Sequence, residues 1–206
     1  MYSGDIYSYL KRQIMCNEIP LGSPIRIHDI ADMLNVSITP VREAMIILEN
    51  EGWVTTKGKN KLVARLSAAD TMERIDVRVA LERLAFELVR ERICPEWIAE
   101  MREILRRATA YDMSRDANNY MLMSNRFHLF LSEKSGNQYL YKTLSDIVEH
   151  MMAINICRYE TSIISRRFVL SEHEKLLEYL EKERWEDYEQ MLVKHIRLWP
   201  EFSKNT

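Results

Sequence analysis

Apolar residues recur at helical spacing in two short stretches near the N-terminus, and a tight turn separates them. This period is typical of amphipathic helices. The two stripes are Ile30, Ala31 and Leu34 in the first stretch, and Val41, Ala44, Met45 and Leu48 in the second. The pattern predicts a helix-turn-helix over residues 27–54, with Asn35-Val36 as the turn and Gly52 closing the second helix.

The start of the second helix carries a capping signal. Ser37 is the expected N-cap, because its hydroxyl can accept from an unpaired N–H of the first turn. Pro40 falls in that turn, where a missing N–H costs little. Thr39 and Arg42 are left on the outward side. In a helix-turn-helix, this second helix is the element that enters the major groove of DNA.

Two short β-prone runs follow, at residues 53–56 and 62–66, with a basic segment between them. Gly58 and Asn60 in this segment tolerate positive φ, which favours a hairpin. Directly after a helix-turn-helix, such a hairpin is a wing placed to reach a phosphate backbone or a minor groove. Taken alone, such a segment is more often a solvated surface loop. Its cations are Lys57, Lys59 and Lys61.

Beyond residue 66, long helical periodicity replaces the β-prone runs, and no strand-like alternation remains. Helical patterns cover residues 68–93, 95–112, 116–134, 137–160, 171–182 and 185–202. The predicted fold class is therefore mostly α. Residues 1–66 form a winged helix-turn-helix with a small β-hairpin wing, and residues 67–206 form an all-α helical bundle with room for a cavity.

Composition supports a globular, helix-rich chain. Of 206 residues, 47% are hydrophobic, and only 5 are Gly and 5 Pro. The net charge is −2, and residues 1–66 carry eight Lys/Arg against seven Asp/Glu. DNA affinity would therefore come from a few well-placed cations and not from a basic domain.

The cysteines and the lack of long apolar runs indicate the cellular compartment of the protein. The three cysteines are far apart and odd in number, which fits reduced thiols better than a disulfide framework. The N-terminus has charges too early for a signal peptide, and no apolar run reaches membrane-spanning length. A cytoplasmic protein without a membrane partner is expected. The cysteines are Cys16, Cys94 and Cys157.

Four of the five histidines lie in the helical half: His128, His150, His173 and His195. His173 is in phase with three leucines of its helix, and His128 belongs to an uncharged polar strip with Ser124 and Asn125. One inward histidine is usually a hydrogen-bonded core residue. Several that converge in one bundle suit a Zn²⁺ or Ni²⁺ ion. Spacing alone leaves both interpretations open.

Residues 14–67 resemble the winged-helix domain of the GntR family of bacterial transcription regulators. The resemblance rests on Ile30-Ala-Asp-Met-Leu34, Val36-Ser-Ile-Thr-Pro-Val-Arg-Glu-Ala-Met45 and Leu48-Glu-Asn-Glu-Gly-Trp-Val54. Two positions depart from the family. Ile38 replaces an arginine that usually contacts DNA, and His28 stands where an arginine or glutamate is common. Ile38 cannot donate two hydrogen bonds to a guanine edge, so an operator of the usual sequence is not expected.

The resemblance implies a set of DNA contacts and a double-stranded DNA operator as partner. Arg42 is expected at a base or phosphate, and the wing lysines at the backbone. Two subunits of a homodimer, joined through the helical half, would occupy successive major grooves of a near-palindromic operator. The implied set is His28, Ser37, Ile38, Thr39, Arg42, Lys57, Lys59 and Lys61.

The helical half resembles the FCD effector domain of the FadR branch of that family. Many members hold a metal through an Asp-x-x-x-His helix motif and two later histidines, which His128, His173 and His195 match in order. Ser124 replaces the aspartate, so a Zn or Ni site would have three histidines and no protein anion. Arg78-x-x-x-Glu82 matches a family element whose arginine can face the ligand cavity.

The resulting interpretation is a ligand-responsive, DNA-binding transcription regulator and not an enzyme. A small effector, expected to be a carboxylate, would bind the helical domain and alter operator affinity. Two alternatives remain open for the histidines: a metal-dependent enzyme and a metal-free effector pocket. A protein-interaction bundle with a degenerate winged helix is a third. The expected effector residues are Arg78, Ser124, Asn125 and His150.

Overall fold

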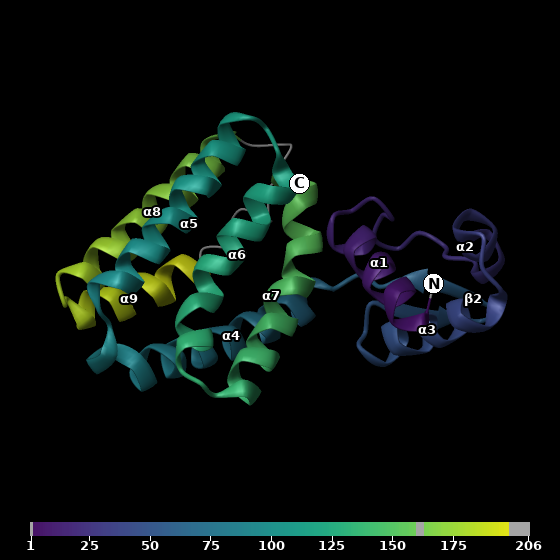
Figure 1. Ribbon diagram of the computed structural model, residues 1–206, viewed down its shortest axis with the longest axis horizontal. Coiled ribbons are helices and arrows are strands. Elements are labelled where there is room, and N and C mark those ends of the chain that lie inside the picture. The colour runs from purple at the N-terminus through teal and green to yellow at the C-terminus, as the bar shows by residue number, and fades with distance from the viewer. Residues whose placement is uncertain (1, 160–162, 198–206) are drawn as a thin grey trace. The chain divides into compact units, whose positions relative to one another are not determined.

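A computed structural model describes the backbone of residues 2–159 and 163–197, and the side chains of residues 2–154 and 166–197. The chain divides into two compact units, Met1–Ser67 and Ala68–Thr206 (Figure 1). Each unit buries its own apolar stripes, and each is described by itself.

Three helices and a hairpin make up the first unit. They are α1 (Ser3–Met15), α2 (Ile27–Leu34), α3 (Ile38–Asn50), β1 (Val54–Lys57) and β2 (Asn60–Val63). The strands are antiparallel, with Val54 opposite Val63. The turn between α2 and α3 contains Asn35 with φ of 52°. The predicted helix-turn-helix and wing are confirmed. The fully buried residues of the first unit are Ile6, Leu10, Ile14, Val41, Ala44, Met45 and Leu48.

The second unit is helical throughout its described residues. Its elements are α4 (Ala68–Val89), the 3₁₀ turn η1 (Arg90–Arg92), α5 (Pro95–Met113), α6 (Ala117–Lys134), α7 (Gln138–Tyr159), α8 (Ile163–Glu181) and α9 (Trp185–Arg197). Helix α5 packs between α6 and α8, and α4 packs against α6, α7 and α9 (Figure 1). The mostly-α fold class is thus confirmed.

One predicted helix boundary was wrong. The helical pattern of the sequence placed the start of a helix at Ser171, but α8 already begins at Ile163. Ser171 lies inside α8, and its hydroxyl donates to the carbonyl oxygen of Phe168. Leu170 is buried and continues the stripe of His173 and Leu177, so core packing decides the boundary. Residues 198–202 of the last predicted helix lie outside the described residues.

Two of the predicted free thiols can be placed. Cys16 and Cys94 form no disulfide, and the side chain of Cys157 lies outside the described residues. Among the helices described, none combines the length and apolar character needed to cross a membrane.

Gly22 and Gly58 offer a matched pair of substitutions in the first unit, because both have positive φ, +79° and +64°. A Cβ at Gly58 meets nothing within 4 Å, whereas one at Gly22 would lie 2.0 Å from Arg65 Nε. Gly58→Ala should lower the free energy of unfolding by about 1 kcal/mol through backbone strain alone. Gly22→Ala should cost about 2 kcal/mol, because it also breaks the Arg65–Leu21 hydrogen bond.

Urea unfolding of the two variants measures the difference. In an Arg65→Ala background, Gly22→Ala should cost no more than Gly58→Ala. If Gly22→Ala and Gly58→Ala lower the free energy of unfolding equally in the wild-type background, the Arg65 side chain moves aside without loss of stability.

Candidate metal centre and nucleic-acid interface

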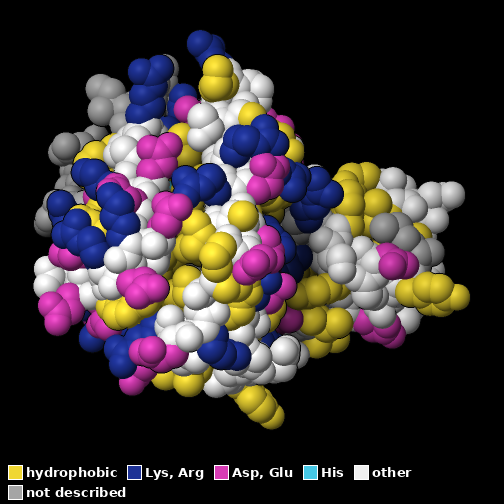
Figure 2. All heavy atoms as spheres, turned by 60° about the vertical axis from the view of Figure 1, so that its left-hand side comes forward, with side chains coloured by type: hydrophobic (Ala, Val, Ile, Leu, Met, Phe, Trp, Pro, Cys, Tyr) yellow, Lys and Arg dark blue, Asp and Glu magenta, His cyan; other side chains and the backbone are white. Residues whose placement is uncertain are grey.

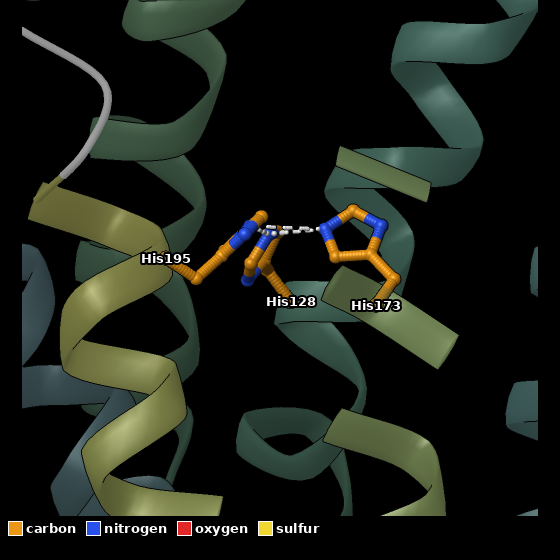
Figure 3. A group of neighbouring side chains, drawn as sticks. All are labelled: His128, His173 and His195. Carbon is orange, nitrogen blue, oxygen red and sulfur yellow. Dashed lines mark hydrogen bonds between the residues drawn. The ribbon is translucent and has the colours of Figure 1, made fainter. Parts of the chain in front are cut away.

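Three histidines from three helices meet in the interior of the second unit. His128 comes from α6, His173 from α8 and His195 from α9, and their Nε2 atoms point toward one another (Figure 3). The Nε2–Nε2 separations are 3.1 Å (128–173), 3.0 Å (173–195) and 3.2 Å (128–195). His128 and His173 are buried, and the side chain of His195 is 8% exposed.

Two carboxylates fix which nitrogen carries the proton in the rings of His128 and His195. His128 Nδ1 lies 2.9 Å from Glu82 Oε2, and His195 Nδ1 lies 2.8 Å from Glu172 Oε2. A carboxylate accepts, so each Nδ1 carries the proton in the neutral imidazole and each Nε2 presents a lone pair. The His173 ring is held by stacking on Phe127, at 4.8 Å between ring centroids.

With His128 and His195 held as Nε2 acceptors, a neutral His173 can supply one proton to the cluster, from its Nε2. One proton cannot satisfy both lone pairs fully, and Nδ1 of His173 is then left without a partner, so an ion between the three Nε2 atoms is the arrangement that would engage all of them. Nitrogens about 3 Å apart can all lie within about 2.0–2.1 Å of one ion, the usual Zn–N distance. Orientation of metal-bound histidines by carboxylates is also common at such sites. The donor set therefore fits a Zn²⁺- or Ni²⁺-class ion.

Burial keeps the imidazoles of His128 and His173 neutral. It lowers the pKa of His128 to about 4, against the attraction of Glu82, with Arg78 adding to the decrease. Burial and the two neighbouring imidazoles likewise hold the pKa of His173 well below its usual range. Neutral imidazole is the form that binds a metal, so protons compete little with an ion at these two side chains near neutral pH.

Arg78 extends the cluster on α4. Its Nε donates to Glu82 Oε1 at 2.6 Å, and the other oxygen of that carboxylate accepts from His128. Burial raises the pKa of Glu82, but the charges and hydrogen bonds of His128 and Arg78 outweigh it and lower the pKa to about 2. Arg78 itself is 7% exposed. A guanidinium, an ionised carboxylate and an imidazole thus form one buried chain.

The predicted effector residues divide into two groups. Ser124 and Asn125 are buried on α6, one helical turn or less before His128. His150 is buried on α7, but its Nδ1 donates to the carbonyl oxygen of Asp146 at 2.8 Å. Within the described part of the chain, the ligand atoms that lie within 4.8 Å of one another come from His128, His173 and His195, and not from His150.

The predicted DNA-binding residues lie on the surface of the first unit. His28, Ser37, Thr39, Arg42, Lys57 and Lys59 are exposed, and Ile38 is half-buried. Ser37 is at the N-cap of α3 but forms no side-chain capping bond, so the predicted cap interaction is wrong. Lys61 is not free: its Nζ lies 2.5 Å from Glu49 Oε2 and 3.2 Å from Thr56 Oγ1.

Both units match known protein families. Residues 2–63 match the family model of the gntR family of bacterial regulatory proteins, and residues 73–198 match that of the FCD domain. The chain belongs to the GntR family. Its FCD domain places this regulator in the FadR-like branch, as the sequence resemblance implied.

Individual proteins similar to this GntR protein are also transcription regulators. It is 26% identical to YdhC, an uncharacterized HTH-type transcriptional regulator of Bacillus subtilis, over 94% of this chain and 87% of the relative. It is 32% identical to the Nta operon transcriptional regulator of Aminobacter aminovorans, over 63% of this chain and 62% of that one. The crystal structure of McbR/YncC from E. coli shares the fold, with a TM-score of 0.82, 21% identity and coverage of 95% and 93%.

The family membership confirms the central functional prediction. The protein is a DNA-binding transcription regulator with a C-terminal effector-binding domain. Its named relatives are transcription regulators.

Sequence reasoning missed the roles of two carboxylates in this GntR regulator. Glu82 was noted only as part of the Arg78-x-x-x-Glu82 element, and Glu172 was given no role. Their partners lie 46 and 23 residues away in the sequence. Both glutamates fall at helical positions that face the core, which the sequence pattern could have shown. A buried carboxylate needs a hydrogen-bonding partner, so each could have been predicted to contact a polar side chain of another helix.

The low pKa of His128 predicts a pH dependence of stability for the metal-free protein. In the unfolded chain, histidine takes up a proton near pH 6.5, whereas folded His128 does so only near pH 4. The unfolded state therefore binds more protons between these values. The stabilisation is complete above pH 6.5 and should be lost as pH falls toward 4, by up to about 3 kcal/mol.

Urea unfolding with chelator present, from pH 7.5 to 4, measures this slope. His128→Gln should flatten it, while His28→Gln, at an exposed position on α2, should not. The same slope in the wild type and in His128→Gln would contradict the prediction.

Proposed function

We propose that this regulator senses a small carboxylate at a metal centre in the helical unit and binds operator DNA as a homodimer. Residues 67–206 carry the metal, the effector and the dimer contact, and residues 1–66 bind DNA. The observation that carries the proposal is the convergence of the Nε2 atoms of His128, His173 and His195, all within 3.2 Å.

These three imidazoles would hold a divalent transition metal, Zn or Ni. Glu82 and Glu172 orient two of the rings through their Nδ1 protons. Since Ser124 replaces the family aspartate, the protein offers no carboxylate ligand at that position. When bound, such an ion supplies positive charge and open positions that accept oxygen ligands.

Arg78 is the candidate residue for a carboxylate effector. A guanidinium carries five N–H donors, and Nε is the one that donates to Glu82. The remaining donors suit an anion in a fixed planar geometry. Ser124 and Asn125 supply uncharged polar groups on the neighbouring helix α6. His150 is left out of the proposed pocket because its Nδ1 is held by its own helix.

Ligand sensing is favoured over catalysis by the state of the nearby carboxylates. A metal-dependent hydrolase needs a general base within reach of its water. Glu82 is committed to Arg78 and His128, and Glu172 accepts from His195. We therefore assign Glu82, and Glu172 through its Oε2 atom, to ring orientation; the Oε1 atom of Glu172 is buried without a partner among the described residues.

On DNA, helix α3 is proposed to enter the major groove with Arg42 and Thr39 outward, and the wing to reach the backbone through Lys57 and Lys59. Lys61 is a weaker candidate, because Glu49 compensates its charge. One head presents few free cations, so useful affinity requires two heads in one particle, and closed two-fold symmetry is the commonest way to supply them.

Metal binding is tested by thermal unfolding with Zn²⁺ or Ni²⁺ after chelator treatment. An ion at about a hundred times its dissociation constant should stabilise the wild type by about 2.7 kcal/mol. His173→Gln should abolish this shift, whereas Ser124→Asp should tighten binding by adding an anionic ligand and Ser124→Ala should change it little.

His150→Gln is the matched control, since it removes a buried histidine outside the cluster and should keep the metal-induced shift. If neither ion moves the wild-type melting temperature and elemental analysis finds no metal, the histidines line a metal-free pocket instead.

DNA contacts are tested by measuring operator affinity at several salt concentrations. Arg42→Ala should weaken operator binding by about 1–3 kcal/mol if it contacts a base edge. Lys59→Ala should weaken all sequences similarly and lower the salt slope by about one unit. Lys61→Ala should have a smaller effect on that slope. Unchanged affinity in folded Arg42→Ala and Lys59→Ala proteins would refute the proposed docking.

A further inference from the structure

The outward side of helix α3 carries a large apolar side chain among polar ones. The inner side of this helix is buried, with Val41 and Leu48 both at 0% exposure. On the opposite side, exposed residues recur at intervals of three, one, three and four, so they share one face of the helix. Within this face, Ile46 is 50% exposed. We call the exposed residues the outer row: Thr39, Arg42, Glu43, Ile46 and Asn50.

Exposure alone does not distinguish Ile46 from other surface residues. Single apolar side chains are scattered over the surface among charges of both signs, as the face in Figure 2 shows. The position of Ile46 does distinguish it, because the outer row is the side of α3 that the proposed docking directs at DNA. In that docking, the side chain of Ile46 meets base edges in the major groove and not bulk water.

The two charged residues beside Ile46 are not engaged within the protein. Arg42 and Glu43 precede Ile46 by about one helical turn, and neither forms an ion pair with a described residue. By contrast, Glu49 near the end of α3 pairs with Lys61. Phosphates repel a carboxylate, whereas the N4 amino group of cytosine donates to one. A helix face that carries Glu43 therefore suits base edges better than the phosphate backbone.

The chemistry of Ile46 selects one feature of a base edge. Its side chain has no hydrogen-bond donor or acceptor, and it would leave a polar base edge without a partner. The C5 methyl group of thymine is the apolar group that bases present in the major groove. The four residues from Arg42 to Ile46 rise by about 6 Å along the helix, which corresponds to roughly two base pairs of DNA.

We propose that Ile46 contacts the C5 methyl group of one thymine in each half-site of the operator, roughly two base pairs from the contact of Arg42. This inference rests on the proposed docking of α3 and names a base that the helix reads. It assigns sequence preference to an apolar contact, on a helix whose first residue, Ile38, offers no donor to guanine. Such a contact neutralises no phosphate, so the preference for thymine is independent of salt concentration.

The test measures affinity for DNA duplexes that the wild-type protein selects from a randomised pool. Each thymine is replaced in turn by deoxyuridine, which lacks only the C5 methyl group. At one thymine of each half-site, the wild type should bind the deoxyuridine duplex about fourfold more weakly, the loss expected for one buried methyl group. Ile46→Ala should bind both duplexes with equal affinity.

Ile47→Ala is the matched control. Ile47 has the same side chain and is 39% exposed, but it lies about 100° around the helix from Ile46 and outside the outer row. Ile47→Ala should therefore discriminate against deoxyuridine as the wild type does.

A new base preference separates base contact from a folding defect. Ile46→Gln should favour adenine over thymine at the same position, because a glutamine amide can bond both N6 and N7 of adenine. If Ile46→Ala discriminates against deoxyuridine as the wild type does, while Arg42→Ala loses affinity, the thymine contact is overturned and the docking of α3 stands. If the wild type selects no duplex, or if Arg42→Ala and Lys59→Ala bind as the wild type does, the docking fails and the inference fails with it.

Discussion

The helical unit is organised around nitrogen lone pairs directed at one buried point. The Nε2 atoms of His128, His173 and His195 lie 3.0 to 3.2 Å apart, while the Nδ1 protons of His128 and His195 are bound by carboxylates on the far side of each ring. Among themselves the neutral rings can share only the proton of His173, so one Nε2 lone pair stays poorly satisfied. The two glutamates beside them orient the rings in the way that carboxylates orient metal-bound histidines.

This arrangement also bears on Ser124, which stands where the family has an aspartate. The two carboxylates that remain act through the rings and keep the Nε2 lone pairs aimed inward. An ion held by three neutral imidazoles would keep its full positive charge, whereas an aspartate ligand would cancel part of it. In the proposed site, an anionic effector would therefore contribute more to binding, and Arg78 on α4 belongs to the same chain of hydrogen bonds.

Periodicity was enough to predict the helix-turn-helix, the wing and the bundle, because each element has one apolar stripe and a single way to bury it. It was misleading near Ser171, where a polar run inside α8 imitated a helix start although Leu170 keeps the stripe in phase. The histidines were predictable from their order along the chain. Glu82 and Glu172 were not, because their roles come from contacts between helices distant in sequence. The pairing of Lys61 with Glu49 was hidden for the same reason.

Arg78 and Glu82 lie on the buried side of α4, a single helix of 22 residues in the helical unit. In a homodimer joined through that unit, as proposed above, occupancy of the histidine centre and association of two chains act on one shared domain. Linkage is reciprocal, so a ligand that tightens the pair must itself bind the pair more tightly than the single chain. The response to an effector would then vary with the cellular abundance of the regulator, and synthesis of the protein would tune its own sensitivity.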